Sequence, residues 1–141
     1  MKFPFDLADK TRREVRDVDG LAGLFFDAAA TELKLPRAYD LRAKGCWPDF
    51  ASDPDLAYGY NDAAVTHSPA TSREVTRYDL ALRVSQYFDA DDAKLVWAAS
   101  HSAARRARGP RWKAISKILG VHPATAKRRY ERAILGLWYK M

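Results

Sequence analysis

Residues 111–138, RWKAISKILGVHPATAKRRYERAILGLW, hold the clearest structural pattern in the chain. Apolar side chains recur there every three or four residues, in two runs on either side of Gly120, which is the spacing of amphipathic helices. Gly120 tolerates the positive φ of a helix end, and Pro123 suits the first position of a following helix. The pattern therefore predicts two helices joined by a tight turn, the first over about 111–119. The apolar positions are Trp112, Ile115, Ile118 and Leu119 in the first run, and Ala126, Tyr130, Ala133, Ile134 and Leu137 in the second.

Small and branched residues are expected to set how these two helices pack. Ala114 is small enough to let the helices approach, and Val121 follows the turn at a position between them. The residues that we expect to be buried together are Ile115, Leu119, Val121, Tyr130 and Ile134.

This two-helix pattern resembles a helix-turn-helix, in particular that of region 4 of bacterial sigma factors. The residues that carry the resemblance are Ala114, Ile115, Leu119, Gly120, Val121, Thr125, Ala126, Arg128 and Arg129. In a helix-turn-helix the N-terminal turns of the second helix enter the DNA major groove. The resemblance therefore implies that Pro123, Ala124, Thr125, Lys127 and Arg128 face the bases. The alternative is an ordinary helical hairpin with a solvated basic face.

Charge is distributed unevenly along the chain. Residues 101–141 hold 11 Lys or Arg and one acid, Glu131, whereas residues 1–100 hold 13 Lys or Arg and 17 acids. A basic block that coincides with a helix-turn-helix pattern indicates a polyanionic partner. Arginine forks in the connection before the first helix suit phosphate oxygens. The residues expected to contact DNA are Arg105, Arg106, Arg108, Arg111, Lys113, His122, Pro123, Ala124, Thr125, Lys127, Arg128, Arg129 and Arg132.

Composition and periodicity predict an all-α protein with a packed core. We expect an N-terminal arm and helix over 1–35, an ordered segment over 36–72, and a helical domain over 73–141 that ends in the helix-turn-helix. The charged run from Asp9 to Asp19 is expected to be a solvated helix start or arm rather than a site. Helices are expected at about 19–35, 72–87 and 91–104, with apolar stripes of Leu21, Leu24, Phe25, Ala28 and Leu35, of Val75, Tyr78 and Leu82, and of Leu95, Val96 and Trp97.

The segment 36–72 combines four prolines with five aromatic residues. Prolines and glycines favour loops, but a polar linker would not need the rings. Packing of these rings on the helical body is the favoured interpretation. A stacking platform for single-stranded nucleic acid is the alternative, although the segment lacks the dense Lys and Arg of such platforms.

Nothing in the sequence favours an enzyme, a cofactor or a membrane segment. There is no phosphate-binding glycine loop, nucleophile elbow or metal-ligand spacing, and no apolar run is long enough to span a bilayer. The aspartates at 89, 91 and 92 are better explained by capping of a helix, through Asp89 or Asp91, than by a metal site. A single cysteine, Cys46, and no visible secretory signal fit a reducing cytoplasm.

A second resemblance covers about residues 35–140 and is carried by a series of short motifs. These are CWPD at 46–49, YGY at 58–60, DA at 62–63, RYD at 77–79, AL at 81–82, DD at 91–92, KLVWA at 94–98 and RWKAI at 111–115, followed by the basic helix. In this order they are similar to an uncharacterised family found in alphaproteobacterial phages, prophages and gene transfer agents. The resemblance implies a phage-type regulator or a DNA-packaging accessory protein with a sigma-like reader at its C-terminal end.

Taken together, the sequence predicts a transcription regulator, either an activator or an antiterminator. Double-stranded DNA is its expected partner, and RNA polymerase is a further candidate partner. Two alternatives stay open: a small terminase-like packaging protein, and a protein-interaction module that uses the basic hairpin. The oligomeric state is not predicted.

Overall fold

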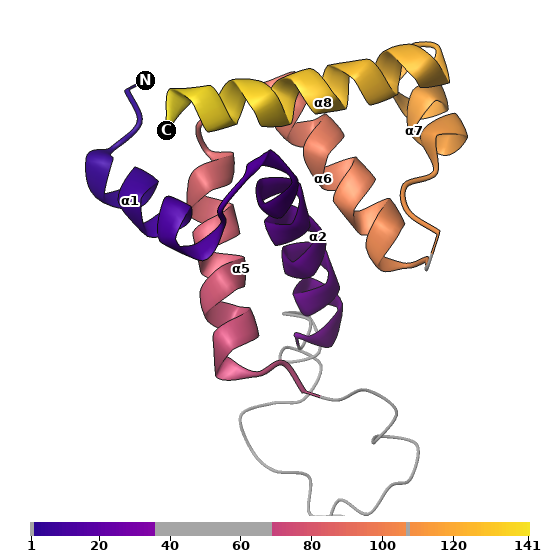
Figure 1. Ribbon diagram of the computed structural model, residues 1–141. Coiled ribbons are helices and arrows are strands. Elements are labelled where there is room, and N and C mark those ends of the chain that lie inside the picture. Colours follow the sequence, from indigo (N-terminus) through magenta and orange to yellow (C-terminus); the bar gives the residue numbers. More distant parts are fainter. Residues whose placement is uncertain (1, 36–68, 107) are drawn as a thin grey trace, which may run out of the picture. The chain divides into compact units, whose positions relative to one another are not determined.

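The computed structural model describes residues 2–35, 69–106 and 108–141, and these form helices and short connections without a strand (Figure 1). The chain divides into two units: Met1–Leu33 with Thr71–Met141, and Lys34–Ala70. The predictions for the aromatic segment 36–72 lie almost wholly outside the described residues. The helices are α1 (Phe5–Glu14), α2 (Val18–Lys34), α5 (Ser72–Ser85), α6 (Ala90–Ala104), α7 (Trp112–Leu119) and α8 (Pro123–Lys140).

Local sequence explains where several of these helices begin and end. α5 starts with a capping box, in which the Thr71 hydroxyl accepts from the Glu74 N–H at 3.3 Å and the Glu74 carboxylate accepts from the Thr71 N–H at 2.7 Å. α7 ends at Gly120, whose φ of 66° is the left-handed conformation that glycine adopts without strain. Pro123 is the first residue of α8. The predicted turn between two helices is therefore confirmed.

The core of the first unit lies where α2, α5, α6, α7 and α8 meet. Phe25 of α2 is fully buried, with its ring centroid 5.5 Å from that of Phe88 and 5.7 Å from that of Trp97. All five apolar positions predicted for the second helix are buried in α8. The core residues are Val15, Leu21, Leu24, Phe25, Ala28, Leu80, Ala81, Val84, Leu95, Val96, Ala99, Ile115, Tyr130, Ala133, Ile134 and Leu137.

The N-terminal residues form a helix, which is one of the two forms expected for the charged run, and Arg12, Arg13 and Arg16 are exposed; the small and apolar residues among them are packed. Ala8 and Thr11 of α1 are buried, and Val15 joins the core. Phe3 lies against Tyr87, with ring centroids 4.4 Å apart. The packing of α1 could not be predicted from the sequence, because its few small buried residues leave only a weak apolar pattern.

Arg77 of α5 links α1 and α2 by ion pairs. It pairs with Glu14 at the end of α1 and donates to the Asp27 carboxylate of α2 at 2.9 Å. The Arg77 side chain is only 21% exposed, so this link is more sheltered than an ordinary surface pair.

Two helix faces, those of α5 and α7, differ from the predicted ones. In α5, Leu80, Ala81 and Val84 face the core, whereas Val75 and Leu82 are exposed by 40% and 39%. The predicted apolar face of α5 is wrong because this helix carries aliphatic residues on both of its sides. Tyr78, also in the predicted stripe, is half-buried.

In the hairpin, the inner face of α7 is narrower than predicted. Ile118 is 81% exposed, and Ala114 is exposed too, so Ala114 is not the contact that lets the helices approach. The fully buried Ala126 of α8 is the small residue on the inner side of the hairpin. Leu119 and Val121 are half-buried; Leu119 packs against the core, and Val121 is not among the core residues.

Two isoleucines of α7 give a matched test of this face. Ile115→Ala is expected to lower the free energy of unfolding by about 2–5 kcal/mol, because it removes a buried aliphatic side chain. Ile118→Ala, three positions further on, should change it by about 0.5 kcal/mol or less, as is usual at the surface. Urea denaturation followed by far-ultraviolet circular dichroism measures both. Equal losses of unfolding free energy in the two variants would contradict a buried Ile115 and an exposed Ile118.

The Tyr130 hydroxyl gives a second test. It is buried without a hydrogen-bond partner among the described residues, and burial raises the pKa of Tyr130 to about 12. Because a hydroxyl buried without a partner costs about 1–3 kcal/mol, Tyr130→Phe should leave stability at neutral pH unchanged or increase it.

The parent protein and Tyr130→Phe should also differ in how the free energy of unfolding depends on pH. Between pH 10 and 12 the unfolded tyrosine loses its proton while the folded one keeps it, so the free energy of unfolding falls as pH rises. Tyr130→Phe should lack this part of the fall, while the other tyrosines titrate alike in both proteins. A loss of more than about 1 kcal/mol at neutral pH would show that the hydroxyl has a partner.

Candidate nucleic-acid interface

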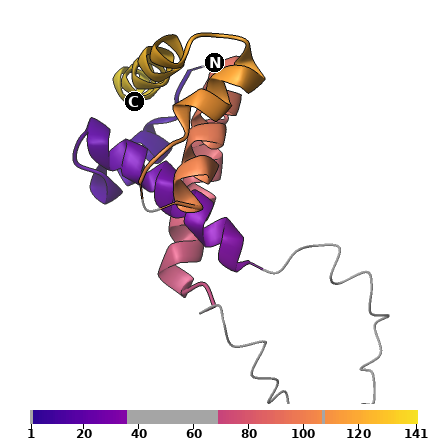
Figure 2. The same cartoon turned by 90° about the vertical axis from the view of Figure 1, so that its right-hand side faces the viewer.

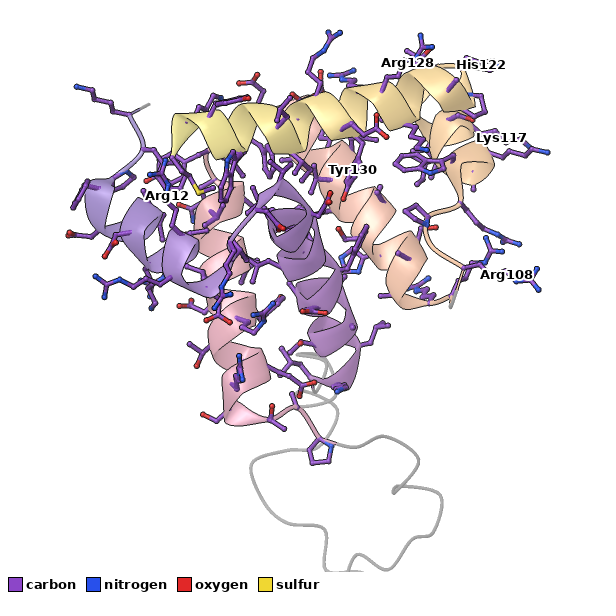
Figure 3. All side chains as sticks on the ribbon, in the orientation of Figure 1. Arg12, Arg108, Lys117, His122, Arg128 and Tyr130 are labelled. Atoms are coloured by element: carbon purple, nitrogen blue, oxygen red, sulfur yellow. The ribbon has the colours of Figure 1, made fainter. Side chains whose placement is uncertain are left out.

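The N-terminal half of α8 presents a polar, basic surface. Ala124, Thr125, Lys127 and Arg128 are exposed there, while Ala126 is buried on the opposite side of the helix. Figure 3 shows Arg128 pointing away from the helical body and Tyr130 pointing toward it. The structure thus brings together, on the outer side of α8, four of the five residues that were predicted to face the bases.

The first turn of α8 is capped by a residue that sequence reasoning had assigned to DNA contact. His122 occupies the N-cap, and its Nδ1 accepts from the Ala124 N–H at 3.3 Å. Pro123 follows at the first helical position and is half-buried. Both residues therefore help to form the end of the helix, although His122 is also exposed.

The connection from α6 to α7 carries four arginines. Arg105, Arg106, Arg108 and Arg111 are exposed, and none forms an ion pair with a carboxylate of the described residues. The Arg111 N–H donates to the Ser102 hydroxyl at 2.9 Å, which ties the start of α7 to α6. These four side chains are thus available to an external anion.

The outer side of α7 adds two lysines to this surface. Lys113 and Lys117 are exposed one helical turn apart, also without an ion pair in the described part of the chain, and Lys117 points outward in Figure 3. Lys117 was not among the predicted contacts, although its four-residue spacing from Lys113 could have indicated it. A groove of about 490 Å³ lies here, lined by Arg106, Arg111, Trp112, Lys113, Ala114 and Lys117.

Arg129 has a different role from the one predicted. Its Nε donates to an Asp92 carboxylate oxygen at 3.0 Å, and its guanidinium lies 3.9 Å from Asp91. Arg129 therefore joins α8 to the start of α6. Arg132, one turn further along α8, is exposed and without an ion pair among the described side chains.

This contact adds an ion pair to the role expected for the aspartates at the start of α6. Asp89 does stand at the N-cap of α6, but its side chain makes no capping hydrogen bond. Asp91 and Asp92 lie in the first turn, where their negative charges interact favourably with the positive end of the helix dipole. Arg129 lies 37 residues from Asp92, so no local pattern indicates this pairing.

The described residues thus make up a helical protein with a basic hairpin at its C-terminal end. The chain belongs to a family described as a domain of unknown function (DUF6362), whose model matches residues 33–137. That match includes the whole basic surface, from Arg105 to Arg132. Searches of curated proteins and of solved structures gave no match. Within the described ranges, no helix is long and apolar enough to cross a membrane.

The pairing of Arg129 with Asp92 can be tested by a double-mutant cycle with Arg129→Ala and Asp92→Ala. Their side chains are 44% and 26% exposed, so we expect a coupling energy of about 0.2–1 kcal/mol at low salt, decreasing as salt is added. Urea unfolding of the four proteins measures it. A coupling energy of zero at low salt would contradict the pairing.

Proposed function

We propose that this protein is a DNA-binding transcription regulator that reads double-stranded DNA with the N-terminal half of α8. The observation that carries this proposal is the side-chain distribution on that helix. Ala126 and Tyr130 anchor it to the body, and this leaves Thr125, Lys127 and Arg128 exposed together at the end of the hairpin. A helix presented in this way can enter the major groove by its first turns.

The surrounding charges would hold the DNA backbone. Arg105, Arg106, Arg108 and Arg111 form no ion pair with a carboxylate of the described residues, and between Ala93 and Tyr130 the sequence contains no Asp or Glu. Guanidinium forks match phosphate oxygens in geometry and charge. Arg128 is then the residue to read a base edge, since Arg commonly binds guanine through two hydrogen bonds. Arg129, held by Asp92, would steady α8 instead.

The proposed role is regulatory rather than enzymatic. It places the protein in the cytoplasm with double-stranded DNA as its ligand and RNA polymerase as a further partner. Activation at a promoter and antitermination during elongation would use the same reading helix. The resemblance of the hairpin to sigma region 4 supports both.

DNA titrations with single-residue variants test this proposal. A preferred duplex is first selected from a random-sequence pool, and binding is then measured by fluorescence anisotropy at several salt concentrations. Arg128→Ala should weaken binding to the preferred duplex by about 1–3 kcal/mol and relax the preference at one base pair. Arg106→Ala should weaken preferred and scrambled duplexes alike and reduce the salt slope by about one unit.

Arg12→Ala is the matched control. Arg12 is an exposed arginine of α1, and Figure 3 places it far from Arg128. Its removal subtracts the same charge but should leave the preference between duplexes unchanged. If Arg128→Ala and Arg12→Ala gave the same small loss on every duplex, direct reading by α8 would be disproved.

A further inference from the structure

A second groove lies between α6 and α7. Its volume is about 780 Å³, and Glu32 of α2 is also part of its lining. Apolar side chains form one part of the lining: Ala98 from α6 and Ala114, Ile115 and Ile118 from α7. Arginines form another part, namely Arg105, Arg106 and Arg111.

Ile118 is the unusual residue of this groove. It is 81% exposed, although its neighbours on the same helix are not. Ile115, one turn before it, is buried, and Leu119, directly after it, packs against the core. Among the described residues, only Phe5 is a more exposed large hydrophobic side chain. An isolated exposed aliphatic residue is ordinary, but this one lines a groove that already contains two alanines and another isoleucine.

The groove combines this apolar lining with arginines that are unpaired within the described part of the chain. Arg105, Arg106 and Arg111 form no ion pair with the described carboxylates. The carboxylate of Glu32 lies 3.2 Å from the His101 Nε2, so it faces an imidazole rather than these arginines. The groove therefore needs a ligand that offers apolar side chains and negative charge at once.

A nucleic-acid backbone would satisfy only half of this requirement. Phosphates would neutralise the arginines but would leave Ile118 against a charged, hydrated strand. An amphipathic helix with acidic residues beside its apolar face satisfies both parts, because aliphatic side chains fill an apolar groove while carboxylates accept from guanidinium forks.

We propose that the groove between α6 and α7 is a docking site for an acidic amphipathic helix of a partner protein. Ile118 is the apolar anchor, and Arg105, Arg106 and Arg111 bind the flanking carboxylates. The site lies off the exposed face of α8 and does not use Arg128, but its three arginines are among those proposed above to hold DNA phosphates, so only Ile118 and Arg128 separate the two kinds of binding.

The test uses a synthetic helical peptide and the full chain. The fluorescent probe carries leucines at three- and four-residue spacing on one face and glutamates on both sides of them. Saturable binding is expected in fluorescence anisotropy. Ile118→Gln should weaken it about tenfold, since it removes one buried aliphatic contact. Arg106→Ala should weaken it severalfold and reduce its dependence on salt.

Three controls make the test specific. Leu135→Gln alters another exposed aliphatic residue, on α8, and should leave peptide affinity unchanged. A peptide of the same composition with its leucines scrambled, and one with lysine in place of glutamate, should each bind far more weakly. Circular dichroism melts should show that Ile118→Gln and Leu135→Gln fold like the parent protein, because both positions are exposed.

The outcomes separate this proposal from the proposed DNA reading. Both proposals are supported if Ile118→Gln weakens peptide binding but not DNA binding, and Arg128→Ala weakens only DNA binding. Peptide binding without any sequence preference for DNA supports the groove alone. No saturable peptide binding, equal binding of the scrambled peptide, or an equal effect of Ile118→Gln on duplex DNA would overturn the docking site.

Discussion

The Tyr130 ring connects the hairpin to the rest of the helical unit. Its centroid lies 6.4 Å from that of Phe26 in α2, in a stacked arrangement, and 5.5 Å from that of Trp112 at the start of α7. Aromatic pairs of this kind contribute beyond their buried area and restrict the relative orientation of the elements that carry them. Because Tyr130 faces inward, Arg128, two positions before it on α8, faces outward, so the same ring that holds α8 in place also sets the direction of Arg128 (Figure 3).

The positive charges fall into two groups with different physical roles. Arg77 of α5 and Arg129 of α8 are paired with carboxylates and join helices to one another. From Arg105 to Lys117 the charges have no carboxylate partner among the described residues, so they repel one another in the free protein. Figure 2, turned by 90°, shows α7 and the connection before it running along one side of the helical unit, so a single anionic ligand could relieve much of that repulsion.

Much of the architecture could be predicted from the sequence because it depends on local signals. The α8 face follows from regular spacing, the turn from Gly120, and the start of α5 from Thr71 and Glu74. Prediction failed where helices carry apolar residues on two sides, as at Ile118 and Leu82, since periodicity alone does not say which side meets a neighbour. The ion pair between Arg129 and Asp92 was out of reach for a different reason. It depends on how two distant helices pack, and a charged residue in a basic run looks the same whether it is paired or free.

The position of α2 has a consequence for the boundaries of a stable fragment. The family match begins at residue 33, after nearly all of α2, yet Leu21, Leu24 and Phe25 are fully buried in the same core as Leu95 and Ile134. A chain cut at that boundary would keep the basic hairpin but expose the apolar faces that α2 covers. Such surfaces favour self-association. The minimal folded unit of this protein is therefore larger than the family-matched region, residues 33–137, and it includes α2.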